Sequence, residues 1–148
     1  MINFSVLGSG SKGNSVFVDI NGVCMLLDCG FSYKESTRRL KMINKKPDMI
    51  SHISWSHNHN DHIVGVDMFT KKHDCSISHG EDLPFIGISA VKLFHDADCY
   101  GYIVTDGTSK LAYIPDTGHI SVDAIKQLSQ VNTVILEFNH DSGMPPGS

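Results

Sequence analysis

A short segment near the middle of the chain carries three histidines and one aspartate within six residues. It reads Ser56-His57-Asn58-His59-Asn60-Asp61-His62. Imidazole and carboxylate groups are the ligands that borderline divalent metals prefer. Because residues two apart in an extended loop point the same way, we expect His57 and His59 to bind one metal ion. Asp61 and His62 would then face a second ion close by.

The elements predicted on either side of this segment can position it. A β-like run over Met49–Ser54 precedes it, and a helix over Asp61–Lys72 follows, with Ile63, Val66 and Phe69 on its apolar side. A histidine tag would lie at a terminus and would lack the flanking strand. The pattern therefore favours a built metal site over an adventitious cluster.

The rest of the chain alternates between short strands and helices, without repeats. Asn21-Gly22 joins two apolar runs and predicts a hairpin. Strands are expected over Ile2–Leu7, Val16–Ile20, Val23–Asp28, Cys75–Ser78, Ile86–Leu93, Tyr100–Thr105, Lys110–Ile114 and Val131–Leu136, and helices over Ser32–Ile43 and Ser121–Leu128. Hairpins and helical crossovers together favour a layered α/β sandwich over a doubly wound parallel sheet.

The composition predicts one domain over residues 1–141 and an irregular tail over 142–148. With 148 residues, 41% of them apolar, the chain can bury a core. The apolar runs are too short to span a bilayer and no basic segment opens the chain, so we expect a cytoplasmic protein without a membrane partner. The four scattered cysteines are interpreted as buried apolar residues.

The net charge of −4 argues against a surface that is a nucleic-acid footprint throughout. It does not exclude a nuclease, because bound divalent cations would add positive charge where phosphates bind.

His57-x-His59-x-Asp61-His62 resembles the signature of the metallo-β-lactamase superfamily. Further segments resemble its YycJ-type (WalJ-like) subgroup, in order along nearly the whole chain: Leu7–Ser15, Leu26–Gly30, His95–Tyr102, Tyr113–Gly118 and Glu137–Asp141. The resemblance implies an αββα sandwich, here shortened at the C-terminus, with the metals at the edge between its two sheets.

The resemblance also implies further site residues. His95 falls where the third histidine of the first metal is expected, and Asp116 falls where a bridging aspartate is expected. The implied metal ligands are His57, His59, Asp61, His62, His95 and Asp116. Asp61 would also orient the attacking hydroxide, and His140 would act on the leaving group.

The activity implied by the resemblance is phosphodiester hydrolysis, typically by a DNA exonuclease, through a hydroxide that bridges two divalent metal ions. Zinc suits the histidine-rich ligands best, and manganese or iron are alternatives. A nucleic acid would then be the substrate.

The chain departs from the family pattern after His140. The family expects one more histidine there for the second metal, and none follows. The chain is therefore a natural short form, a fragment, or a binding protein that has lost full activity. A shortened sandwich would expose a sheet edge, so we expect a homo-oligomer that covers this edge.

Two other functions stay open. The same metals could serve a small-molecule hydrolase acting on a thioester, lactone or cyclic nucleotide, because fold and site chemistry do not fix the substrate. The chain could also be a non-catalytic metal-binding module with an incomplete second site.

Three further features have weaker signals. Asp28 ends a buried strand, where a bare carboxylate is costly, so it would orient a ligand histidine or the signature loop, unless it only caps a turn. Gly8–Ser15 lacks the end of a P-loop and is interpreted as a tight turn near the site. His52, His73 and His79 show no ligand spacing and are interpreted as structural or solvated.

Overall fold

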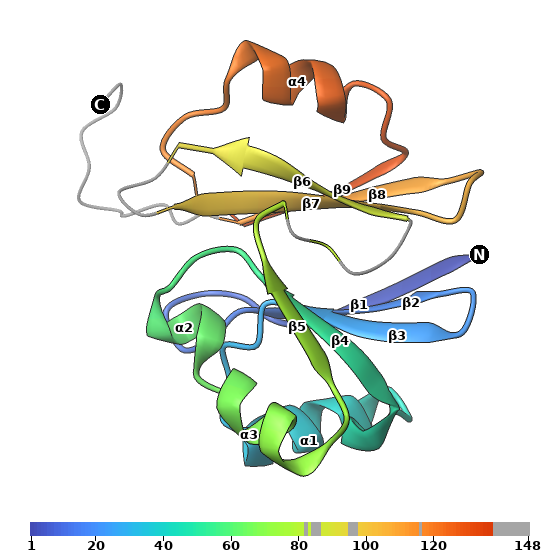
Figure 1. The fold of residues 1–148 in the computed structure, drawn as a ribbon, viewed down its shortest axis with the longest axis vertical. Coiled ribbons are helices and arrows are strands. Elements are labelled where there is room, and N and C mark those ends of the chain that lie inside the picture. Colours follow the sequence, from blue (N-terminus) through green and yellow to red (C-terminus); the bar gives the residue numbers. More distant parts are fainter. Residues whose placement is uncertain (82, 84–86, 95–97, 116, 138–148) are drawn as a thin grey trace.

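Two β-sheets pack face to face, and helices cover the outside of each (Figure 1). The computed structural model describes residues 1–81, 83, 87–94, 98–115 and 117–137. The first sheet contains β1 (Ile2–Gly8), β2 (Ser15–Ile20), β3 (Val23–Leu27), β4 (Ile50–Trp55) and β5 (Ser76–His79) in that spatial order. The second contains β6 (Ile88–Leu93), β7 (Cys99–Thr105), β8 (Lys110–Ile114) and β9 (Thr133–Leu136), also in order.

The helices form the two outer layers. The helices α1 (Tyr33–Met42), α2 (Asn60–Ile63) and α3 (Val66–Lys72) lie on the side of the first sheet, where a short 3-10 turn, η1 (Pro47–Met49), leads into β4. The remaining helix, α4 (Val122–Leu128), covers the second sheet (Figure 1). The order helix, sheet, sheet, helix confirms the expected αββα sandwich. No helix in the described ranges is long and apolar enough to span a membrane.

The connections of the first sheet bring the candidate site residues to one edge. The strands β1, β2 and β3 are antiparallel, and the predicted turn at Asn21-Gly22 joins the last two with φ angles of 52° and 92°. Helix crossovers then make β3, β4 and β5 parallel. Because parallel strands present their carboxyl ends at the same edge, Asp28 and the loop after β4 meet there.

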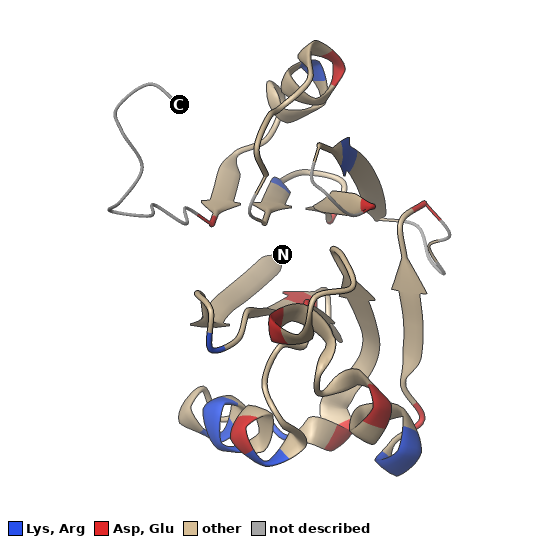
Figure 2. Ribbon diagram, turned by 90° about the vertical axis from the view of Figure 1, so that its left-hand side faces the viewer, with Lys and Arg blue, Asp and Glu red and all other residues tan. Residues whose placement is uncertain are grey.

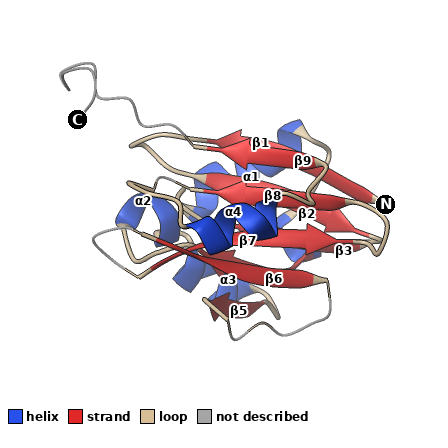
Figure 3. Ribbon diagram, turned by 90° about the horizontal axis from the view of Figure 1, so that it is seen from above, coloured by secondary structure: helices blue, strands red, loops and turns tan. Residues whose placement is uncertain are grey.

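The second sheet also combines antiparallel strands with a parallel strand that follows a helix. The strands β6, β7 and β8 are antiparallel, and α4 connects β8 to the parallel strand β9. Seen from above, β1 and β9 run along the same side of the sandwich, each as an outer strand of its sheet (Figure 3). The oligomer expected to cover an open sheet edge stays a prediction.

The core has an inner layer between the sheets and outer layers beneath the helices. Val18 and Met25 pack against Tyr102 from the second sheet in the inner layer. Leu26 and Phe69 belong to the layer beneath α1 and α3. Because both faces of β2 and β3 are covered, nearly every side chain of these strands is buried, which explains their continuous apolar sequence.

The helix predicted over Asp61–Lys72 is wrong as a single element. It divides into α2 and α3, with Gly65 between them. The amide of Gly65 donates to the carbonyl oxygen of Cys29 at 2.9 Å, and a β-carbon at this position would lie 2.4 Å from the carbonyl oxygen of Phe31. The chain therefore breaks its helix to approach the loop after β3. That approach depends on tertiary contacts, which the helical periodicity of the sequence does not show.

A histidine is buried within the first sheet, away from the signature loop. The side chain of His52 on β4 is 1% exposed, and its ring nitrogens lie 2.7–2.9 Å from the hydroxyl oxygens of Ser54, Ser76 and Ser78. Burial lowers the pKa of His52 to about 4. The structural role expected for His52 agrees with this placement.

We predict that the buried His52 makes the fold sensitive to acid. The unfolded chain takes up a proton on this ring near pH 6.5, whereas the native chain does so only near pH 4. Between these values the unfolded state binds more protons, so native stability falls as the pH falls, by at most about 1.4 kcal/mol per pH unit from this group. Urea unfolding at pH 7, 6 and 5 measures the slope.

The matched variants are His52→Gln and His119→Gln, the second of which changes an exposed histidine. We expect a flatter slope for His52→Gln and the wild-type slope for His119→Gln. An equal slope in both variants would show that the acid sensitivity arises elsewhere.

Candidate metal centre

Three loops meet at the edge where β3 and β4 end, and backbone hydrogen bonds join them. The amide of Asn14 donates to the carbonyl oxygen of Asp61 at 2.7 Å. The amide of Gly30 donates to the carbonyl oxygen of Asn14 at 2.9 Å. The amide of Cys29 donates to the carbonyl oxygen of His62 at 2.8 Å. The signature segment is therefore tied by its backbone to the loops that follow β1 and β3.

The predicted ligand side chains of this segment lie together in two pairs. Nε2 of His57 is 3.0 Å from Nδ1 of His59. Nε2 of His62 is 3.6 Å from Oδ2 of Asp61. The rings of His57 and His62 have centroids 4.1 Å apart, so the two pairs are neighbours.

Burial divides these four side chains into two kinds. His57 and His62 are 1% and 2% exposed, whereas His59 is exposed and Asp61 is half-buried. The buried rings can be oriented by the protein interior. The other two donors border the solvent, where a metal ion or a substrate arrives.

The carboxylate of Asp28 is the interior group that orients them. It is fully buried, and its backbone leaves β3 in the left-handed region with a φ of 60°. The amide and the hydroxyl of Ser56 donate to its two oxygens at 2.7 and 2.9 Å. The hydroxyl of Tyr113, from the second sheet, donates to Oδ2 at 2.6 Å. Nδ1 of His62 lies 2.6 Å from the same oxygen.

These contacts select one tautomer for each buried ring. An ionised carboxylate only accepts, so Nδ1 of His62 carries the hydrogen and Nε2 keeps its lone pair. The hydroxyl of Ser56 donates to Asp28, so it accepts from Nδ1 of His57, which lies 2.9 Å away. Nε2 of His57 then also keeps its lone pair. In this tautomer Nε2 is the nitrogen through which imidazole can bind a metal, and here Nε2 of His57 lies 3.0 Å from Nδ1 of His59.

The contacts with Asp28 also change the pKa values of His62 and Tyr113. Burial of His62 opposes its protonation, but the hydrogen bond and charge of Asp28, helped by the charges of Asp61 and Glu137, outweigh burial and raise its pKa. Burial, together with the charge and hydrogen bond of Asp28, also raises the pKa of Tyr113 well above its ordinary value. Tyr113 therefore stays a neutral donor to the carboxylate.

The donor set fits divalent metal ions in its chemistry and in its pairwise spacing. Two ligands bound about 2.0–2.1 Å from one tetrahedral ion lie roughly 3.3 Å apart. The separations of 3.0 Å for His57 and His59 and 3.6 Å for Asp61 and His62 bracket this value. Within the described ranges, no group of three or more His, Cys, Asp or Glu side chains is arranged to hold one ion.

The remaining sequence-predicted site residues are His95, Asp116 and His140. All three lie outside the residues that the structure describes. The roles assigned to them from the family pattern stay predictions.

Sequence reasoning gave no role to Asn14, Ser56 or Tyr113, which all contact site residues. Nδ2 of Asn14 donates to Oδ2 of Asp61 at 3.2 Å and lies 3.2 Å from Nε2 of His62. Asn14 is 1% exposed. A polar residue between a glycine turn and an apolar strand was the available signal for it. Tyr113 is 85 residues from Asp28 along the chain, and no local pattern connects the two.

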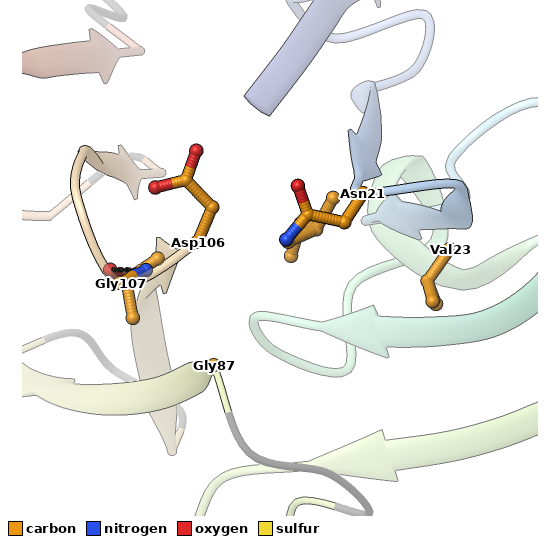
Figure 4. Close-up of a pocket in the computed structure, with 7 residues that line it drawn as sticks. Asn21, Val23, Gly87, Asp106 and Gly107 are labelled. Carbon is orange, nitrogen blue, oxygen red and sulfur yellow. Dashed lines mark hydrogen bonds between the residues drawn. The ribbon is translucent and has the colours of Figure 1, made fainter. Parts of the chain in front are cut away.

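A separate open pocket lies at the opposite end of the first sheet, near the turn between β2 and β3 (Figure 4). It has a volume of about 410 Å³ and is lined by Ile20, Asn21, Val23, Gly87, Thr105, Asp106 and Gly107. Among the described lining residues, Asp106 is the single ionisable side chain. Backbone amides of Ser109 and Thr108, together with the N-terminal amino group, bind its carboxylate and lower its pKa. The part of this lining that the structure describes therefore holds no cluster of reactive groups.

Comparison with known proteins agrees with the site's chemistry. A family model described as the metallo-beta-lactamase superfamily matches residues 8–94. The exodeoxyribonuclease YycJ of Bacillus anthracis is 29% identical over 171 aligned positions, which cover 97% of this chain. The chain spans only 65% of the length of that relative.

Solved structures show the same fold at lower identity. The metallo-beta-lactamase fold protein YhfI from Bacillus subtilis superposes with a TM-score of 0.76 at 16% identity, covering 97% of this chain and 73% of that one. The short form of human tRNase Z superposes with a TM-score of 0.70 at 15% identity, covering 90% and 76%.

We predict that Gly30→Ala destabilises the fold at this site. An added β-carbon would lie 1.7 Å from the carbonyl oxygen of Asp61, which is fixed backbone. The loops would have to separate, so we expect the free energy of unfolding to fall by about 3 kcal/mol or more, measured by urea denaturation.

Gly118→Ala is the control, because among the described residues the nearest atom to an added β-carbon there, apart from its chain neighbours, is 4.0 Å away. We expect it to change the free energy of unfolding by less than about 0.5 kcal/mol. Wild-type stability in Gly30→Ala would contradict the close approach of the loops.

Proposed function

The chain belongs to the metallo-β-lactamase superfamily, and from this premise we propose that it is a metal-dependent phosphodiesterase that hydrolyses DNA as an exonuclease. The observation that carries the proposal is the pair of buried histidines, His57 and His62, whose Nδ1 atoms contact Ser56 and Asp28, beside the donors His59 and Asp61. Similarity to the exodeoxyribonuclease YycJ supports the choice of substrate.

In this proposal the signature segment and two loop residues hold two divalent ions. His57 and His59, with His95, would hold the first ion, and Asp61 and His62, with Asp116, the second. When bound, such ions supply Lewis acidity, lower the pKa of water towards neutrality and offset charge on the phosphoryl oxygens. Zinc suits the imidazole nitrogens best, and manganese or iron also accept mixed nitrogen and oxygen ligands.

The protein's own side chains would orient the metal ligands, orient the attacking water and protonate the leaving group. Asp28 would orient the ring of His62 directly and the ring of His57 through Ser56, so that Nδ1 of each ring faces the interior. Asp61 is half-buried and borders the solvent, so its carboxylate could accept a hydrogen bond from an attacking water and orient it. His140 is proposed to protonate the leaving group.

A small-molecule substrate is the second candidate, and the distribution of charge favours it. Figure 2 views the molecule from the side on which α2 lies. In this view Lys and Arg lie mainly on the outer helices, away from the space between the two sheets. The net charge of the chain is −4. A panel of single-stranded DNA, RNA and small thioesters, lactones and cyclic nucleotides separates the two candidates.

We predict that Asp61→Ala removes turnover without unfolding the chain. The side chain is partly exposed, and the backbone carbonyl that binds Asn14 remains in the variant. We expect kcat to fall by about 100-fold or more, as for loss of a positioned acid or base group. Release of nucleotides from single-stranded DNA measures it.

Asp123→Ala is the control for that variant. It removes an exposed carboxylate from α4, at 87% side-chain exposure, and should retain wild-type turnover. Wild-type turnover in Asp61→Ala would overturn the proposed mechanism.

We predict that Asp28→Asn weakens metal binding by about 10- to 100-fold, as is typical when the group orienting a ligand histidine is changed. The amide can accept through one oxygen only, so it cannot fix both Ser56 and His62. Competition with a chromophoric chelator, on protein without a histidine tag, measures the affinity.

Tyr113→Phe keeps the carboxylate and the ring while removing one hydrogen bond, so its loss of affinity should be smaller. Asp106→Asn, at the opposite end of the sheet, should bind metal as the wild type does. Unchanged affinity in folded Asp28→Asn and in Tyr113→Phe would contradict the orienting role of Asp28.

A further inference from the structure

An open groove lies beside the signature segment, between the end of β4 and the helices α2 and α3. Its volume is about 360 Å³, within the range of about 300–1,000 Å³ common for ligand pockets. Its lining includes Trp55, Asn58, Asn60, Ile63, Val64 and Ile77. None of these was predicted from the sequence to bind a ligand.

The groove and the metal ligands share the signature segment as a common wall. Asn58 and Asn60 line the groove, and they alternate in the sequence with His57 and His59. The backbone bends at His57 and Asn58, and Asn60 begins α2, so these residues adjoin one another along a turn and one segment can serve both sites. A ligand in the groove therefore lies immediately beside the candidate metal centre.

Trp55, which lines this groove, belongs to a row of aromatic side chains. The rings of Trp55 and His79 stack at 5.5 Å with an interplanar angle of 10°. His79 meets Tyr100 edge to face at 5.3 Å, and the amino group of Lys92 lies 4.5 Å above the Tyr100 ring. Trp55 is only half-buried.

Hydrogen bonds hold this row in place before any ligand arrives. Nε1 of Trp55 donates to Oδ1 of Asn58 at 2.9 Å, which fixes the indole and the amide together. The carbonyl oxygen of Trp55 accepts from Nδ1 of His79 at 3.0 Å and from the hydroxyl of Tyr102 at 2.7 Å. A fixed aromatic surface loses little conformational entropy when a ring stacks on it.

The lining selects for a neutral, flat ligand with a polar edge. Val64 and Ile77 are 54% and 47% exposed and offer apolar contact. The two asparagine amides can pair with donors and acceptors, and Asp67 is the single charged side chain among the described lining residues. A phosphate group would find no cation in that lining, whereas a nucleobase matches each of these features.

We propose that this groove binds a nucleobase of the DNA strand whose phosphodiester is cleaved at the metal centre, with Trp55 as the stacking surface. The inference rests on the proposed nuclease function for the position of the phosphate. It adds that the substrate is single-stranded at this point, because a base paired in a duplex cannot enter the groove.

The fluorescence of Trp55 tests the inference directly, because it is the single tryptophan of the chain. The probe is a thymidine tetranucleotide with phosphorothioate linkages, which resist hydrolysis, added to the metal-loaded protein. Stacking should shift or quench the emission. The same backbone with abasic sugars should leave it unchanged. Equal responses to the two probes, or no response to either, would overturn the base-binding groove.

Variants give a second reading by polarisation of a labelled tetranucleotide. Trp55→Leu should bind about tenfold more weakly or worse, while Trp55→Phe should retain most of the affinity, because base stacking needs an aromatic ring. Val64→Ser, which leaves Trp55 intact and changes an exposed side chain, should also weaken binding, and Val122→Ser on α4 should not. Wild-type affinity in Trp55→Leu and Val64→Ser would contradict the inference.

Hydrolysis of unmodified DNA, measured in parallel, separates the two proposals. Hydrolysis without a base-dependent change in Trp55 emission would overturn the groove and leave the nuclease intact. A base-dependent change without hydrolysis would support the groove and overturn the nuclease.

Discussion

The carboxylate of Asp28 lies where the two sheets and the histidine-bearing segment meet, and the geometry of the site depends on it. It accepts from Ser56 and Tyr113 and lies 2.6 Å from Nδ1 of His62. A buried carboxylate is stable only when such donors surround it. The same donors therefore stabilise the charge and fix the positions of the groups that supply them. Loss of one partner in such a buried network typically costs about 3–5 kcal/mol.

This arrangement separates a rigid interior from an accessible surface within one short segment. His57 and His62 are buried and oriented, whereas His59 and Asp61 border the solvent. The backbone bonds that tie the segment to Asn14 and Cys29 restrict its motion further. Preorganised ligands avoid the cost of ordering when a metal binds, and the exposed donors leave room for a substrate.

The signature segment also lines the groove proposed to bind a nucleobase. Asn58 and Asn60 line a groove with Trp55, and the described lining of this groove is apolar and amide in character apart from Asp67. The fold alone does not identify a substrate, because one fold can carry sites with different chemistry. In our proposal the side chains of this groove carry that information, and they favour a flat ring next to a phosphodiester.

The sequence by itself determined the features that depend on neighbouring residues. The spacing of His57, His59, Asp61 and His62, the hairpin turn at Asn21-Gly22 and the buried strands were all predictable, because turn and strand patterns are local. Most strand and helix limits agree with the predictions to within about two residues.

Only the tertiary structure decided which distant groups meet. The contact between Asp28 and Tyr113 spans 85 residues, the break at Gly65 arises from its approach to Cys29, and the stack of Trp55 on His79 requires β4 and β5 to pair in register. These contacts form because the sheets and loops pack against one another. No period or spacing within a single element encodes that packing.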